Sequence, residues 1–314
     1  MPAPTCSDQE FIRVWNTCRS SPRVAKALGI ASACVVRRRR AIEKRHGIQL
    51  DTEDHYGRKE FQHKPSCEAR ATVELLNGTV VIASDAHYWP GEPTVAHQAF
   101  VRVIKQIKPD IVVMNGDVLD GASISSHDRF GWEELPSVAD ELKAVKDRMS
   151  EIERAAKGAR LLKTRGNHCL RFDKRIATKA PEFNGIDGFR LADHLPAWPE
   201  TWSIWINDEV VIKHRHHNGL HATWNNALRG GKTICTGHLH RLQVTCLNDY
   251  NGTRYGVDTG TLADPWGPQF EYMEDGVRNW NAGFAVLTFV DGKLIHPELC
   301  HVMNGKAYFR GREV

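Results

Sequence analysis

The chain has 314 residues with ordinary fractions of hydrophobic and charged residues, so it is long enough to bury a substantial core. It contains no apolar run near the roughly 20 residues of a membrane-spanning helix. Its first residues, MPAPTCSDQE, do not have the pattern of a secretory signal. The eight cysteines include no Cys-x-x-Cys pair, which disfavours a zinc ribbon and a redox motif. We therefore expect no membrane segment and a cytoplasmic location.

The net charge of +4 is unevenly distributed along the chain. Residues 1–50 hold ten Lys and Arg against three acidic residues, a net charge of +7, so the remaining 264 residues sum to −3. Such an asymmetry suggests a basic element that binds a polyanion, joined to a domain with another purpose.

The basic segment 1–50 predicts three short helices. Ser21 and Pro22 are typical of a helix start, and Gly29 is typical of a helix end. A longer helix is expected over residues 32–45, with arginines around most of its surface. The spacing of Ala25, Gly29 and Val35 resembles the helix-turn-helix family.

That resemblance implies a small all-α DNA-binding domain whose second helix enters the major groove. The candidate contacts to bases or phosphates are Ser32, Ala33, Arg37 and Arg38. The alternative is that the run of arginines at 37–40 forms a solvated face of a small helical cap. Residues 51–70 are polar and without periodicity, which indicates a linker.

The segment 71–314 alternates between strand and helix patterns and predicts a layered α/β domain. Buried strands are expected at 80–84, 110–117 and 159–168, with helices at 95–107 and about 137–157. The later half is richer in strands, expected at 201–206, 209–214, 232–240, 242–247, 253–260 and 283–290, with one helix at 220–231.

Polar side chains gather where five of these strands end. In a sheet of this class the carboxyl ends of the strands are where ligands bind. The strand ends offer carboxylate, imidazole and amide groups, which is the composition of a two-metal site. They are Asp85, His87, Asp117, Asp120, Asn167, His168, His214, His238 and His240.

The order of these motifs carries more information than any one of them. Asp85-x-His87, Gly116-Asp117-x-x-Asp120, Gly166-Asn167-His168, a strand-end histidine and Gly237-His238-x-His240 resemble the calcineurin-like metallophosphoesterase superfamily over about 160 residues. The stretch 250–270 is also similar to a branch encoded by phages and prophages. The resemblance implies a four-layer sandwich, with two mixed β-sheets flanked by helices.

The resemblance also implies a dinuclear metal centre. Asp85, His87 and His240 would hold one ion, Asn167, His214 and His238 the other, and Asp117 would bridge them. A bridging carboxylate can hold two divalent ions about 3.5 to 4 Å apart. Mn²⁺ is the expected metal, with Fe, Zn²⁺ or Ni²⁺ as alternatives.

His168 and Asp120 are implied to form the catalytic pair. His168 would protonate the leaving oxygen or stabilise the transition state, and Asp120 would orient its ring and raise its pKa. Many family members place an acid after Gly-Asn-His, whereas this chain has Cys169; Asp173 is a possible substitute. Arg165, Arg171 and Arg241 flank motif residues and could touch phosphate or simply be solvated.

The stretch KHRHHNGLH, residues 213–221, holds four histidines where the motif order needs one ligand. His214 ends an apolar strand and is the predicted ligand, and His217 is the alternative. His216 is expected in a loop that lines the substrate channel, and His221 is expected at the start of the following helix.

These features together predict a DNA-associated metallophosphoesterase. A dinuclear site would activate hydroxide for attack on a phosphate ester, with phosphodiesters and nuclease activity preferred, and the basic segment would deliver it to DNA. One alternative is a phosphomonoesterase that acts on proteins or nucleotides. The other is a non-catalytic DNA-binding phage adaptor. If the chain is phage-encoded, its compartment is the host cytoplasm.

Overall fold

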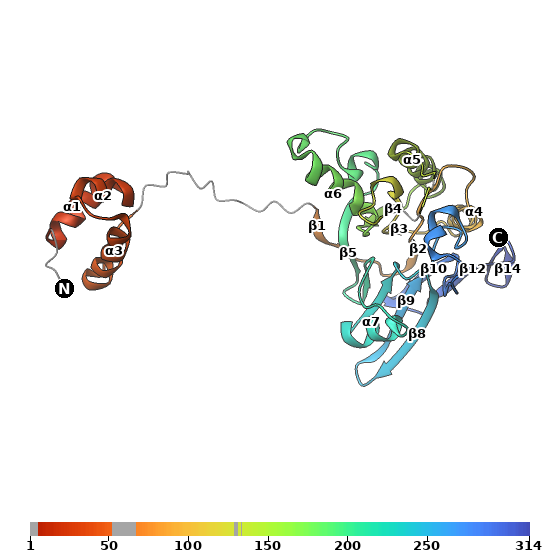
Figure 1. The fold of residues 1–314 in the computed structure, drawn as a ribbon. Helices are drawn as coiled ribbons and strands as arrows, with labels where there is room; N and C mark the ends of the chain where they lie inside the picture. The colour runs from red at the N-terminus through yellow and green to blue at the C-terminus, as the bar shows by residue number, and fades with distance from the viewer. Residues whose placement is uncertain (1–5, 52–66, 129–130, 133) are drawn as a thin grey trace. The chain divides into compact units, whose positions relative to one another are not determined.

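The structure is a computed structural model that describes residues 6–51, 67–128, 131–132 and 134–314. The chain divides into two compact units, Met1–Lys64 and Pro65–Val314 (Figure 1). No helix of the described residues is long and apolar enough to cross a membrane.

The first unit is a three-helix fold, and its helices form as expected. They are α1 (Asp8–Cys18), α2 (Ser21–Leu28) and α3 (Ser32–His46). Gly29 and Gly47 adopt the left-handed conformation that ends α2 and α3. Seven apolar side chains from the three helices and the segment after them form one small core, namely Phe11, Trp15, Val24, Ala25, Val35, Ile42 and Leu50.

Helix α3 carries six of the ten Lys and Arg of residues 1–50. Ser32, Ala33, Arg37 and Arg40 are exposed. Arg38 is half-buried, because its guanidinium donates to the carbonyl of Cys6 and lies over the ring of Phe11 at 5.3 Å. Arg37 and Arg40 are therefore better placed than Arg38 to reach a ligand, and the helix-turn-helix assignment stays a prediction.

In the described residues of the second unit, fourteen strands are joined in one continuous network. Their order is β14-β13-β12-β10-β2-β3-β4-β5-β6-β7-β9-β8, with β1 on β5 and β11 on β10. The strands are β1 (Glu68–Val73), β2 (Gly78–Ala83), β3 (Ile111–Asn115), β4 (Arg160–Thr164), β5 (Glu200–Ile206), β6 (Val210–Ile212), β7 (Thr233–Thr236), β8 (Leu242–Asp249), β9 (Gly252–Thr259), β10 (Gly283–Val290), β11 (Lys293–Leu294), β12 (Glu298–Met303), β13 (Lys306–Phe309) and β14 (Arg312–Glu313).

Strand β5 connects the two halves of this network. Its first residues pair with β4, and its last residues pair with β6. One face of β2 and β3 packs against β5, β6, β7 and β9 in a core made of strand residues alone, with Val80, Ile82, Ile204, Ile212 and Val257 among them. The two halves therefore lie face to face, as in the predicted sandwich of two mixed sheets.

Helices cover the outer faces of both halves. Helices α4 (Val95–Ile107) and α5 (Val138–Ala155) bury Phe100, Ile104, Val145 and Met149 against the outer face of β2 and β3. Helix α7 (Ala222–Gly230) lies beside β8 and β9 in Figure 1 and packs on β7, β8 and β9. The order helix, sheet, sheet, helix confirms the four-layer α/β fold.

Six of the strands and α-helices in the described residues were not expected, namely β1, α6 and the C-terminal strands β11 to β14. Strand β1 begins at Glu68, inside the segment predicted as a linker, while residues 52–66 of that segment lie outside the described part of the chain. Its first residues are exposed, so backbone pairing with β5 rather than apolar periodicity makes it a strand. Helix α6 (Cys169–Lys179) starts directly after His168, at the end of the stretch 159–168 that was expected to be a strand, and no helix was expected there.

Candidate metal centre

The predicted site residues follow the carboxyl ends of neighbouring strands. Asp85 and His87 follow β2, Asp117 follows β3, and β2, β3 and β4 run parallel. Five of the site residues have a positive φ, a conformation that costs free energy and collects at functional sites. They are Asp85, His87, Asp117, His238 and His240.

Gly166 and Gly237 of the motifs lie so close to site carboxylates that no side chain fits at either position. A Cβ on Gly166 would lie 2.0 Å from Oδ1 of Asp117, and a Cβ on Gly237 would lie 2.4 Å from Oδ2 of Asp85. Any larger residue would therefore displace a carboxylate of the site.

The first of three side-chain groups combines Asp85, His87 and His240, whose donor atoms lie within 4.8 Å of one another. Oδ1 of Asp85 is 3.2 Å from Nε2 of His240 and 3.8 Å from Nε2 of His87. That oxygen and Nε2 of His87 are buried and have no hydrogen-bond partner among the described residues. A buried donor set with unmet polar atoms fits a cation.

The second group combines Asp117, His214 and His238. Nδ1 of His214 donates to the carbonyl of Asn115 at 2.8 Å, which turns Nε2 toward Oδ2 of Asp117, also at 2.8 Å. Oδ1 of Asn167 lies 3.2 Å from the same Nε2. Carboxylate, imidazole and amide ligands suit a divalent transition metal.

The two groups meet at Asp85. Oδ1 of Asp85 lies 3.9 Å from Nε2 of His214 as well as near His87 and His240. Oδ1 of Asp117, by contrast, accepts the backbone N–H groups of His168 and Cys169 at 2.7 and 3.2 Å. The assignment of Asp117 as the bridging ligand stays a prediction.

The third group combines His87, Asp120 and His168. Oδ1 of Asp120 is 2.8 Å from Nδ1 of His87 and 3.1 Å from Nδ1 of His168. Arg171 completes this group, because it donates to the carbonyl of Asp120 at 3.0 Å and lies 3.3 Å from Nε2 of His168. Asp120 thereby links the predicted catalytic histidine to a predicted metal ligand.

The electrostatics of the site follow from burial and close pairing. Burial lowers the pKa of His87, but the hydrogen bond to Asp120 and the nearby carboxylate of Asp85 outweigh it and raise that pKa to about 10. Burial raises the pKa of Asp120, but His168 and His87 hold it well below its usual range. Paired charges of this kind are what a bound cation would replace.

The expected upward shift of the His168 pKa is wrong for this arrangement. Burial lowers the pKa of His168, and the neighbouring His87 lowers it further, so the hydrogen bond to Asp120 does not prevail. The sequence indicated the carboxylate partner but not the depth of the ring or its contact with His87, whose ring centroid lies 4.5 Å away.

Residues 78–242, more than half of the chain, match the family model described as calcineurin-like phosphoesterase. The chain belongs to this family. The gene 54 protein of Mycobacterium phage L5 is 27% identical over 261 residues, which are 76% of this chain and 98% of that protein.

Two solved structures are also similar to the chain. The phosphoesterase YfcE from E. coli is 15% identical, with 70% of this chain and 97% of that chain covered and a TM-score of 0.34. A dimetal phosphatase from Danio rerio is 10% identical, with 76% and 98% covered and a TM-score of 0.34. Both TM-scores are low, so the family assignment rests on the match over residues 78–242.

Within this phosphoesterase, the histidine-rich stretch contributes one side chain to the groups described above. His214 lies in the second group. The backbone N–H of His217 donates to Asn226 at 2.9 Å, and its ring lies against His216 at a centroid distance of 4.5 Å. His214 is therefore the residue of this stretch that is positioned as a ligand.

The structure also distinguishes between the three arginines that flank the motifs and shows the partners of Asp173. Asp173 lies 2.9 Å from Arg165 and accepts the N–H of Leu191, so it is not a partner of His168. Arg241 donates to backbone carbonyls of residues 219 and 220. Of the three arginines considered from sequence, Arg171 is the one beside the predicted catalytic pair.

Two aromatic side chains, Phe270 and Trp280, pack behind the site, and no sequence pattern indicated this role. Phe270 and Trp280 come from the segment between β9 and β10, which includes the short helix η4 (Pro268–Met273). Phe270 lies 5.3 Å from the ring of His87, and Trp280 lies 4.7 Å from that of His240. These contacts fix the imidazole rings and limit water near the first group.

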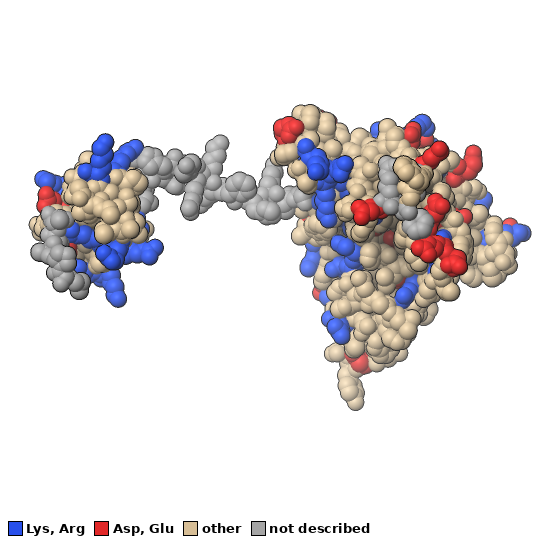
Figure 2. Space-filling model, viewed as in Figure 1, with Lys and Arg blue, Asp and Glu red and all other residues tan. Residues whose placement is uncertain are grey.

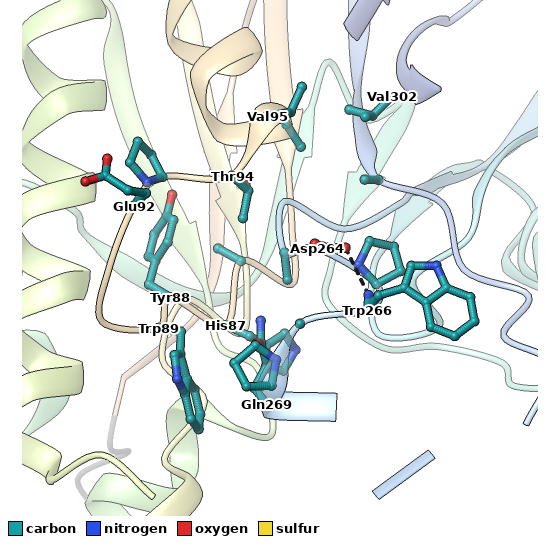
Figure 3. Close-up of a pocket in the computed structure, with 18 of the residues that line it drawn as sticks. His87, Tyr88, Trp89, Glu92, Thr94, Val95, Asp264, Trp266, Gln269 and Val302 are labelled. Atoms are coloured by element: carbon teal, nitrogen blue, oxygen red, sulfur yellow. Dashed lines mark hydrogen bonds between the residues drawn. The ribbon is translucent and has the colours of Figure 1, made fainter. Parts of the chain in front are cut away.

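Two pockets adjoin the site. One, of about 460 Å³, is lined by Asp120, His168 and Arg171, with Trp89 and Tyr272 on its wall. The other, of about 700 Å³, reaches His87; Figure 3 shows His87 and Gln269 between the rings of Trp89 and Trp266 in that view. The first pocket is the one that opens on the predicted catalytic pair.

Proposed function

We propose that the chain is a dinuclear metal-dependent phosphodiesterase that acts on DNA. The observation that carries the proposal is the sharing of Asp120 between His87 and His168, at 2.8 and 3.1 Å. This contact supports a role for His168 as a proton donor beside the side chains that are suited to hold metal.

We assign seven side chains to two cations. Two divalent cations bound by these residues would lower the pKa of a coordinated water and neutralise charge on phosphoryl oxygens. Mn²⁺ is the expected metal, with Fe, Zn²⁺ or Ni²⁺ as alternatives. The proposed ligands are Asp85, His87 and His240 for one ion, Asn167, His214 and His238 for the other, and Asp117 between them.

His168 is the proposed proton donor to the leaving oxygen. His168 lines the 460 Å³ pocket, with its Nδ1 3.1 Å from Asp120 and its Nε2 3.3 Å from Arg171. A bound phosphate anion raises the pKa of the imidazole and favours the doubly protonated form, whose Nε2–H can be donated. The guanidinium of Arg171 is placed to bind a phosphoryl oxygen.

The size of the pocket favours an organic leaving group. A volume of about 460 Å³ exceeds what a phosphate alone fills, and Trp89 and Tyr272 offer aromatic surface beside His168. The N-terminal unit adds a basic surface, with Arg37 and Arg40 exposed on α3. Both features support a nucleic-acid substrate, and the phage relative supports action in a host cytoplasm.

One set of assays tests this proposal. The Mn²⁺-reconstituted protein is given p-nitrophenyl phosphate, bis(p-nitrophenyl) phosphate, and single- and double-stranded DNA, with Asp117→Asn as the control. We expect hydrolysis of the diester and of DNA, both lost in the variant. Activity on the monoester alone would instead show a phosphomonoesterase, and hydrolysis that survives Asp117→Asn would exclude the two-metal mechanism.

A further inference from the structure

Helix α6 presents a row of basic side chains to solvent. Arg171, Arg175 and Lys179 are four residues apart, so they lie on one face at intervals of about 6 Å along the helix axis. Lys174, Arg175 and Lys179 are exposed, and Arg171 is half-buried. Figure 2 shows Lys and Arg gathered over α6 on the catalytic unit.

This row begins at the catalytic pair. Arg171 lies 3.3 Å from Nε2 of His168 and donates to the carbonyl of Asp120 at 3.0 Å. His168 itself immediately precedes the helix. A chain of phosphates that had one member at His168 would therefore meet Arg175 and Lys179 next.

No acidic side chain of the described residues forms an ion pair with Lys174, Arg175 or Lys179. Asp173 is the one acid in α6, and it lies on another side, against Arg165 and the N–H of Leu191. The next exposed acid along the chain is Glu182. The positive charge of Arg175 and Lys179 is thus left for an external anion, whereas Arg171 lies 3.5 Å from Oδ2 of Asp120.

Helix stability does not explain the row. A cation in the first turn opposes the helix dipole, yet α6 has Arg171 there and no acid. Helix α5 shows the favourable pattern, with Asp140 and Glu141 in its first turn. Lys179 alone, in the last turn of α6, sits where the dipole favours a cation.

We propose that the row Arg171, Arg175 and Lys179 binds the phosphodiester backbone of a nucleic-acid strand whose scissile phosphate lies at His168. The inference rests on the proposed function. It narrows the substrate class from phosphodiesters in general to nucleic-acid strands. Charge complementarity and the 6 Å spacing suit successive backbone phosphates rather than an isolated nucleotide.

The test compares two double variants of the full chain that remove equal charge. Arg175→Gln with Lys179→Gln removes the outer part of the row. Lys105→Gln with Lys146→Gln removes two exposed lysines on α4 and α5 and is the matched control. Both are assayed on bis(p-nitrophenyl) phosphate and on a single-stranded oligonucleotide over a range of salt, and both are checked for unchanged melting.

We expect the α6 variant to raise KM for the oligonucleotide about tenfold and to reduce the slope of log(kcat/KM) against log[salt] by about 1.4, that is about 0.7 per lost phosphate contact. Its kcat/KM on the small diester and all values for the control should stay unchanged. An unchanged oligonucleotide KM, or an equal loss in the control, would overturn the inference while leaving the phosphodiesterase intact.

Oligonucleotide affinity separates this inference from the reaction itself. Fluorescence anisotropy is measured with both double variants in a full-length Arg37→Gln and Arg40→Gln background, which reduces binding by the N-terminal unit. Weaker binding by the α6 variant alone supports the row even if no diester is hydrolysed. Equal affinities in both variants refute it.

Discussion

Helix α3 of the N-terminal unit and the carboxyl edge of the catalytic sheet both concentrate charge, but they hold it differently. On α3, Arg37 and Arg40 are exposed, and no acid of the described residues forms an ion pair with either. At the sheet edge, Asp85 and His87 are almost fully buried and share partners with other site residues. Exposed charges act nearly independently, whereas a buried network responds as a unit.

The hydrophobic cores of the two units also differ, chiefly in size. The N-terminal unit rests on seven buried apolar residues, while the catalytic unit has two large clusters on the two faces of its sheets. The large core of the second unit can stabilise five site residues at positive φ. The small core of the N-terminal unit could not offset a strain of that size. Single substitutions are therefore expected to have small effects in the N-terminal unit and large effects at the site of the second unit.

The largest expected effect is that of His214→Ala, with His217→Ala as the matched control. His214 lies 2.8 Å from Asp117, so its loss should remove about one of two metal equivalents and lower kcat by about 10³-fold or more. His217→Ala should keep both metals and near-normal turnover. Metal content by mass spectrometry and a diesterase assay check both; the reverse pattern would reassign the ligand.

His168→Ala should have the next largest effect, on rate and not on metal content. Loss of a general acid lowers kcat by about 10² to 10⁴. Asp120 contacts both His168 and His87. The loss of kcat in the double variant Asp120→Asn with His168→Ala should therefore be smaller than the product of the two single losses. A double-mutant cycle on the diester measures this coupling, and strictly additive losses would contradict a shared unit.

The arginines of α3 should give smaller and additive effects. Arg37→Gln and Arg40→Gln are each expected to weaken duplex DNA binding several-fold and to reduce the salt slope by about 0.9. Arg38→Gln should instead lower the melting temperature of the unit, because Arg38 donates to Cys6 and packs on Phe11. Gel shifts at low salt and thermal melts distinguish the two; absence of any shift by the unmodified chain would remove the DNA proposal.

A separate expected effect is on the pH dependence of stability and involves Glu141. This buried carboxylate accepts the N–H groups of Gly121 and Ala122, and burial raises its pKa to about 7. A raised carboxyl pKa means that the folded state holds the proton more tightly, so stability falls as pH rises from about 4.5 through 7.

Glu141→Gln should remove that part of the pH dependence. The free energy of unfolding of the unmodified chain, relative to the variant, is expected to fall by about 2 to 3 kcal/mol between pH 5 and pH 8. Urea unfolding at the two pH values measures the difference. Parallel stability curves for the two proteins would show that Glu141 does not titrate in this range.

Local patterns predicted much of the fold. Periodic apolar residues placed α4 at the observed bounds and most strands within a few residues, because these elements bury one or both faces in a core. The patterns did not indicate β1, whose first residues are exposed, or α6, which starts directly after His168, or the C-terminal strands β11 to β14. Strand β1 and helix α6 are defined by pairing and packing against distant segments.

What the sequence by itself determined was the family, the four-layer fold and the set of side chains gathered at the sheet edge. Motif order carries that information, because strand ends of a parallel sheet converge whatever the loops between them. Only the tertiary structure decided that His214 rather than His217 faces Asp117, that burial lowers the pKa of His168, and that Phe270 and Trp280 back the histidines. These features depend on the depth and orientation of single side chains, which are set by contacts between residues far apart in the chain.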